Sequence, residues 1–283
     1  MLGLILDAQK MWDEVLVNAD SRVKDWFMMS SLVPTLVICL LYFGAVLIGP
    51  TFMEKRKPLN IKNILVLYNL AMVALSTYLF MEFLLSGWAN GYSLRCQPVD
   101  FSNSKTAIRM ANACWWFYIS KFIELLDTIF FITRKKYNQV TYLHVFHHGV
   151  MPFSWWFGVK FVPGGFGTFH AMINSFIHLV MYTYYGLAAL GPRYQKYLWW
   201  KKYMTKLQLA QFVICLAHAS QLLYMECNYP TVFVYWILLN AGSFLILFAN
   251  FYYQSYISHK SKPQRNGTVR NGDVRNGIKS KTG

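Results

Sequence analysis

The chain has 283 residues, of which 55% are hydrophobic and only 14% are charged. An average soluble domain is roughly 25% charged, because a folded globule needs polar residues to cover its surface. The low charge therefore excludes an ordinary water-soluble globule, and the high hydrophobicity excludes an intrinsically disordered chain. An integral membrane protein is the class that remains.

Seven mostly apolar segments are long enough to cross a bilayer as helices. They are Leu32–Gly49, Ile64–Leu85, Ala111–Ile132, Tyr142–Val159, Phe166–Leu190, Leu207–Met225 and Val232–Tyr256. The segment before them, residues 1–30, predicts a short amphipathic helix on the membrane surface. The sequence thus predicts a seven-helix membrane domain over residues 1–258.

The net charge of +15 is explained by where the Lys and Arg residues lie relative to these helices. Seven crossings place 19 of the 27 Lys and Arg residues on one side of the membrane and seven on the other. Because cytosolic connections are enriched in Lys and Arg, we expect the C-terminus in the cytosol and the N-terminus in the lumen. Membrane orientation therefore accounts for the charge, and no nucleic acid partner is expected.

The last 25 residues, 259–283, have no apolar period and predict a disordered, basic cytosolic tail. Lys279 and Lys281 stand five and three places from the end, which resembles a signal for retrieval to the endoplasmic reticulum. The alternative is a basic tail in which this spacing arises by chance.

Three histidines, His144, His147 and His148, form an H-x-x-H-H motif at the cytosolic start of the fourth predicted helix. Because a helix turns about 100° per residue, all three side chains share one face. Grouped imidazoles suit either metal ligation or acid–base and nucleophilic chemistry. We therefore expect a functional cluster.

The third predicted helix carries Lys121, Glu124 and Asp127. Charged residues are costly in lipid, so we expect them to face a protein interior. An ion pair that tethers helices is as plausible for them as a direct catalytic role.

The fifth and sixth predicted helices add further polar side chains to this interior. His170, Asn174 and His178 recur every fourth residue, and of these we expect His178 to be functional and His170 to be structural. Gln208 and Gln211 share a stripe of the sixth helix and are interpreted as amide donors that line a cavity.

Cys96 and Cys227 both lie in predicted lumenal loops, after the second and sixth helices. The lumen permits disulfides, so the sequence predicts a bond between them.

Two other function classes are compatible with parts of this pattern. Di-iron membrane oxygenases and desaturases also use an H-x-x-H-H motif, but they repeat histidine motifs to ligate two metal ions, and this chain has one such motif. We therefore expect no metal and no other cofactor. A seven-helix transporter or receptor would share the topology, but it assigns no role to the three histidines.

Four motifs follow one another along the chain with fixed spacing. They are Lys121-x-x-Glu124-x-x-Asp127-Thr128, His144-x-x-His147-His148, His178-x-x-Met181-Tyr182 and Thr205-x-x-Gln208-x-x-Gln211. In this order they resemble the very-long-chain fatty acid elongases of the endoplasmic reticulum, the ELO-type 3-oxoacyl-CoA synthases. The resemblance covers about residues 20–256 and is nearest to the subgroup favouring saturated and monounsaturated acyl-CoAs.

The resemblance implies an acyltransferase that condenses malonyl-CoA with a long-chain acyl-CoA, giving CO2, CoA and a 3-oxoacyl-CoA two carbons longer. No cysteine adjoins the histidine motif, so we expect His147 to accept the acyl group as an acyl-imidazole. His178, with His144 or His148, is expected to position or protonate substrate groups. Side chains expected to stabilise oxyanions or support the site are Asn174, Gln208, Gln211, Lys121, Glu124, Asp127 and Tyr182.

The resemblance also implies an all-α integral membrane fold of seven transmembrane helices, six of which enclose an acyl-chain tunnel open to the cytosol. Its expected partners are lipids of the endoplasmic reticulum membrane and the 3-oxoacyl-CoA reductase, dehydratase and enoyl reductase of the following steps. A homodimer is also considered.

Overall fold

The computed structural model describes residues 10–258, and all regular structure in that part of the chain is helical. Its long helices are α2 (Val33–Met53), α3 (Lys62–Phe83), α4 (Lys105–Thr133), α5 (Tyr142–Phe161), α6 (Thr168–Leu190), α7 (Lys201–Ser220) and α8 (Thr231–Tyr256). Each overlaps one of the predicted apolar segments. The all-helical fold class is therefore confirmed for the described residues, whereas the predicted tail with Lys279 and Lys281 lies outside them.

Three of these helices are long and apolar enough to cross a membrane: α2, α8, and α3 together with the π-helical turn Leu84–Trp88. Helices α4 to α7 have at least 20 residues each, so they are also long enough. They differ from the other three in their polar content, because they carry the buried side chains described below. The fold therefore concentrates its polar groups in the middle of the chain.

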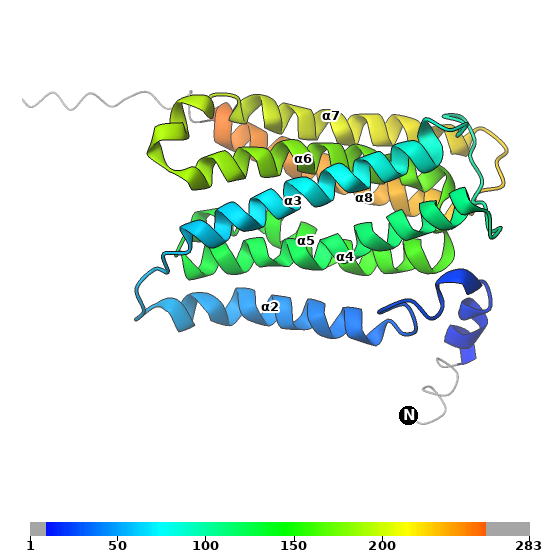
Figure 1. Ribbon diagram of the computed structural model, residues 1–283, viewed down its shortest axis with the longest axis horizontal. Helices are drawn as coiled ribbons and strands as arrows, with labels where there is room; N and C mark the ends of the chain where they lie inside the picture. The colour runs from blue at the N-terminus through cyan, green and yellow to red at the C-terminus, as the bar shows by residue number, and fades with distance from the viewer. Residues whose placement is uncertain (1–9, 259–283) are drawn as a thin grey trace, which may run out of the picture.

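The long helices lie side by side along the long axis of the molecule, and their connections alternate between its two ends (Figure 1). At one end, Leu59 N–H donates to Thr133 O and joins the α2–α3 and α4–α5 connections. We call this the basic end, because it carries residues 55–57 and 134–136. At the other, the disulfide end, Cys96 and Cys227 link the α3–α4 and α7–α8 connections.

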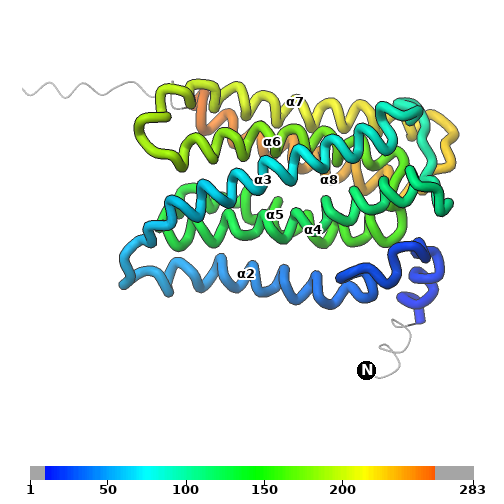
Figure 2. The backbone as a smooth tube through the Cα atoms, viewed as in Figure 1, coloured from blue at the N-terminus to red at the C-terminus, as the bar shows by residue number. Residues whose placement is uncertain are grey.

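The segment before α2 is not the single surface helix that the sequence predicts. Residues 10–16 are helical, a 3-10 turn follows at Ser21–Val23, and the segment folds against the disulfide end of the bundle (Figure 2). Trp12 stacks on Trp156 of α5 with ring centroids 6.0 Å apart. The buried Lys160 ammonium holds this arrangement by donating to a main-chain carbonyl, 2.9 Å away. The segment therefore packs against the helix bundle.

The start of α5 fixes the position of the histidine motif. Thr141 caps this helix, because its Oγ1 accepts a hydrogen bond from the main-chain N–H of His144 at 3.3 Å. The motif therefore occupies the first two turns of α5, at the basic end. Helix α2 packs against α4 and α5 along one edge of the bundle (Figure 1).

Candidate functional site

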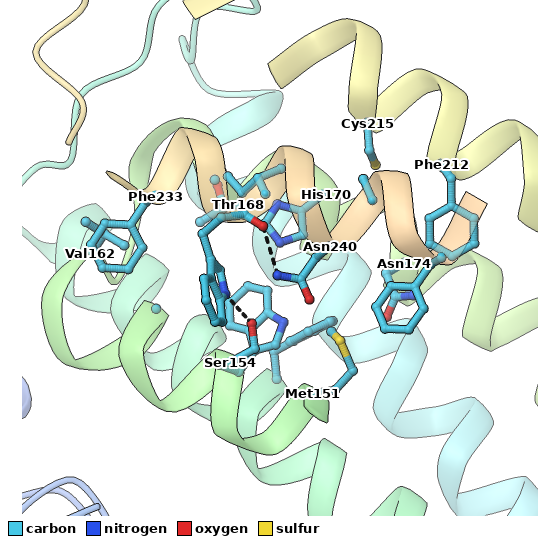
Figure 3. A pocket seen from close by; sticks show the side chains of 18 of the residues that line it. Met151, Ser154, Val162, Thr168, His170, Asn174, Phe212, Cys215, Phe233 and Asn240 are labelled. Carbon is cyan, nitrogen blue, oxygen red and sulfur yellow. Dashed lines mark hydrogen bonds between the residues drawn. The ribbon is translucent and has the colours of Figure 1, made fainter. Parts of the chain in front are cut away.

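A cavity lies among helices α5, α6, α7 and α8 (Figure 3). It contains about 850 Å3 of space not filled by atoms, part of which is open to the surroundings. Pockets for small molecules combine apolar walls with a few polar groups. The polar side chains at its wall are His147, Ser154, Thr168, His170, Asn174, Gln211 and Asn240. The cavity therefore has the composition of a binding site for an apolar molecule.

The cavity is long in the direction of α5. It is lined at one end by His147 and at the other by Val162. These residues are 15 positions apart, which corresponds to about 22 Å along a helix. Gly167 and Tyr229, near the disulfide end, also line it. Phe212 and Phe244 add aromatic surface on the side of α7 and α8. The wall of the cavity is therefore mostly apolar and follows α5 from His147 to the disulfide end.

The structure brings the three histidines of the motif together but gives them different surroundings. His147 lines the cavity, and its ring is 5.1 Å from that of His148. The ring of His148 is in turn 4.3 Å from that of His144. His144 Nε2 lies 2.8 Å from Thr128 Oγ1 of α4. Thus His147 faces the ligand space, and the other two lie behind it.

A buried network connects α4 to α6 near the cavity. Lys121 Nζ lies 2.7 Å from Glu124 Oε1, and both residues are 1% exposed. The same carboxylate oxygen is 3.1 Å from His178 Nδ1. Lys121 Nζ also donates to Asn174 Oδ1 at 3.2 Å, and Asn174 lines the cavity. Residues from the first and third sequence motifs therefore form one connected group.

Two further predicted residues form a second buried contact between the same helices. The Tyr182 hydroxyl donates to Asp127 Oδ2 at 2.8 Å. Neither side chain lines the cavity. This pair therefore joins α4 to α6 without reaching the ligand space.

The two glutamines of α7 separate in the structure. Gln211 lines the cavity, whereas the Gln208 amide lies 3.8 Å from the sulfur of Met181 and is not part of the wall. The interpretation of both as cavity-lining donors therefore stays a prediction for Gln208, which is not among the residues that line this cavity. His170, interpreted as structural, does line the cavity.

Metal ligation has no ready set of side chains in the described part of the chain. Within residues 10–258, no group of three or more His, Cys, Asp or Glu side chains is placed to hold one metal ion.

Comparison with known proteins identifies the family to which the chain belongs. The model of the ELO: GNS1/SUR4 family matches residues 27–264, which include every helix from α2 to α8. The chain belongs to the ELO family. It is 55% identical to a very long chain fatty acid elongase of Aedes aegypti, over 86% of this chain and 68% of that protein. It is 50% identical to very long chain fatty acid elongase 7 of Rattus norvegicus, over 92% and 95%, and 49% identical to very long chain fatty acid elongase 1 of Homo sapiens, over 91% and 94%.

Ser154 and Trp236 are among the cavity-lining residues that sequence reasoning missed. Trp236 Nε1 of α8 donates to Ser154 Oγ of α5 at 2.6 Å, and both side chains line the cavity. A signal was present, since His147, Ser154 and Gly158 recur on one stripe of α5. Nothing in the sequence identifies Trp236 as their neighbour, because that depends on how α8 packs.

Proposed function

We propose that this protein is the condensing enzyme of fatty acid elongation, an acyltransferase of the 3-oxoacyl-CoA synthase class. The observation that carries the proposal is the position of His147 at one end of an apolar cavity about 22 Å long. Relatives named as very long chain fatty acid elongases, aligned over about nine-tenths of the chain, support the same reaction.

The first half-reaction transfers the acyl group to the protein. An unprotonated nitrogen of His147 attacks the thioester carbonyl carbon, the C–S bond breaks, and CoA leaves with a proton as the free thiol. The product is an acyl-imidazole whose chain occupies the apolar cavity. The Asn174 and Gln211 amides, which line the same cavity, are placed to donate hydrogen bonds to the developing oxyanion.

The second half-reaction forms the new carbon–carbon bond. Malonyl-CoA loses its free carboxylate as CO2, and the electron pair of the broken bond remains on the adjacent carbon. This carbanion attacks the acyl carbonyl carbon and displaces His147 as the imidazolate, which gives a 3-oxoacyl-CoA two carbons longer. The imidazolate then takes up a proton from water, which restores the imidazole. In this scheme His178 is the acid–base group, while His144 and His148 position His147.

The proposal includes a topology and a location. All seven long helices cross the membrane of the endoplasmic reticulum, with the basic end in the cytosol, the N-terminus in the lumen and the C-terminus in the cytosol. Charge supports this orientation, because basic connections remain cytosolic, and the Cys96–Cys227 disulfide at the opposite end suits an oxidising lumen. Helices α3 to α8 enclose the acyl-chain tunnel, with α2 outside. The catalytic domain is residues 1–258, and Lys279 and Lys281 in the tail 259–283 direct retrieval.

The product of this reaction determines which enzymes we expect as partners. A 3-oxoacyl-CoA is consumed by a reductase, then by a dehydratase and an enoyl reductase, which we expect in the same membrane. The acyl donors are long-chain acyl-CoAs, saturated or monounsaturated.

The test uses purified protein in detergent with stearoyl-CoA or oleoyl-CoA and radiolabelled malonyl-CoA, without NADPH. We expect release of CO2 and a labelled 3-oxoacyl-CoA that is two carbons longer than the donor. No product from folded protein that contains iron would favour the di-iron oxygenase. Neither product nor iron would favour the transporter or receptor.

A further inference from the structure

The buried carboxylate of Glu124 makes two contacts through a single oxygen. Its Oε1 lies 2.7 Å from Lys121 Nζ and 3.1 Å from His178 Nδ1. Its other oxygen, Oε2, is buried and has no hydrogen-bond partner among the described residues. A buried carboxylate needs a counter-charge, which the Lys121 ammonium supplies. Displacement of this one oxygen would therefore release both partners.

The carboxylate determines which nitrogen of His178 carries the proton. An ionised carboxylate only accepts hydrogen bonds, so the nitrogen that faces it must be protonated. In a neutral imidazole this places the hydrogen on Nδ1 and leaves a lone pair on Nε2. His178 is only 7% exposed, so water does not offer competing partners to most of the ring.

The ammonium determines the orientation of the Asn174 amide by the same logic. Lys121 Nζ has only donors, so the group that faces it at 3.2 Å must be the carbonyl oxygen of the amide. The NH2 group of Asn174 then occupies the opposite branch of the planar amide, away from Lys121. Because Asn174 lines the cavity beside His147, this branch is the donor available to a ligand.

We propose that Lys121 and Glu124 are a positioning pair that fixes the proton on His178 Nδ1 and turns the Asn174 NH2 group toward the ligand space. The proposal rests on the condensing activity proposed above and gives each residue of the pair a role in it. Glu124 acts through His178, whose Nε2 lone pair accepts the proton that the His147 ring loses in the first half-reaction and passes it to the CoA sulfur. Lys121 acts through Asn174, whose NH2 group stabilises the oxyanion of the same half-reaction.

The first half-reaction can be measured by itself, because acyl-CoA alone reports acyl transfer through release of CoA. We expect Glu124→Gln, which keeps the shape and removes the charge, to slow this release about 100-fold, since loss of the carboxylate that orients a histidine is costly.

A double-mutant cycle tests whether Glu124 acts through His178. We expect the loss of activity in Glu124→Gln combined with His178→Ala to be smaller than the product of the two single losses. Losses that multiply would overturn the positioning role. The matched control is Glu82→Gln, which breaks the Arg109–Glu82 ion pair at the far ends of α3 and α4 and should leave the rate of CoA release unchanged.

A readout that needs no activity keeps this inference distinct from the proposed reaction. In protein labelled with 15N in its histidine rings, the resonances lost in His178→Ala assign this residue. We expect the Nδ1-protonated form in the wild type and a mixture of tautomers in Glu124→Gln. A wild type protonated on Nε2 would contradict the inference even if the enzyme condenses. A wild type that makes no 3-oxoacyl-CoA would instead overturn the proposed reaction, whatever the tautomer.

Discussion

The Trp236 indole N–H donates to Ser154 Oγ at 2.6 Å, across the contact between α8 and α5. Trp236 is 36% exposed and yet lines the cavity, so one side chain forms the wall between the ligand space and the outer surface.

We expect Trp236→Phe to lower the free energy of unfolding by about 1 kcal/mol, because it keeps an aromatic ring and removes the hydrogen-bond donor. Unfolding in mixed micelles measures this change. Trp199→Phe is the control, since Trp199 is 73% exposed and should tolerate the same replacement without loss. Equal effects at both positions would show that the bond to Ser154 contributes nothing.

Gly158 provides a test of the cavity as the acyl site. This residue lies on α5 about 16 Å along the helix from His147, and the nearest atom to a Cβ added there is 3.5 Å away, in Trp155. A leucine at this position therefore fits the backbone and projects into the cavity. We expect Gly158→Leu to reject the longest acyl-CoAs while it still elongates shorter ones.

The measurement is the distribution of product lengths from a mixture of acyl-CoAs. Gly44→Leu is the matched control, because Gly44 lies in α2 and a Cβ there meets no atom within 4 Å. An unchanged distribution for Gly158→Leu would place the acyl chain elsewhere.

The Cys96–Cys227 disulfide closes a long loop, since its cysteines are 131 residues apart. We expect Cys96→Ser to destabilise the protein by about 2–4 kcal/mol, mainly because the unfolded chain gains freedom. Cys227→Ser should have a similar effect, and the double variant should be no worse than either single one. Additive losses would indicate that each cysteine stabilises the fold separately.

Gly165 has a conformation and a neighbour that both require glycine. Its φ is +66°, and a Cβ would lie 2.9 Å from the main-chain oxygens of Gln97 and Pro98. We expect Gly165→Ala to lower the melting temperature more than Gly91→Ala. Gly91 has a φ of +93° but open space around it, so its variant reports the conformational cost alone, about 1–2 kcal/mol. Similar shifts for both would show that the α3–α4 connection moves away at little cost.

Apolar length and polar spacing predicted the helices and the histidine cluster from the sequence. The spacing of His144, His147 and His148 shows that they share a face of one helix, which a single segment determines. It does not show that His147 alone among them lines the cavity, or that Gln211 lines it and Gln208 does not. Those facts depend on the rotation and packing of neighbouring helices, which are tertiary properties. The packing of the N-terminal segment against the bundle could not be predicted for the same reason.

The central claim is that His147 carries the acyl group, and the mass of the peptide that contains His147 tests it most directly. Purified protein would be mixed with stearoyl-CoA in the absence of malonyl-CoA, quenched, digested and sequenced by mass spectrometry. We expect one stearoyl group on the peptide that contains His147, its loss on addition of malonyl-CoA, and no adduct in His147→Ala. Turnover by His147→Ala at the wild-type rate, or a stable adduct on another residue, would contradict the account.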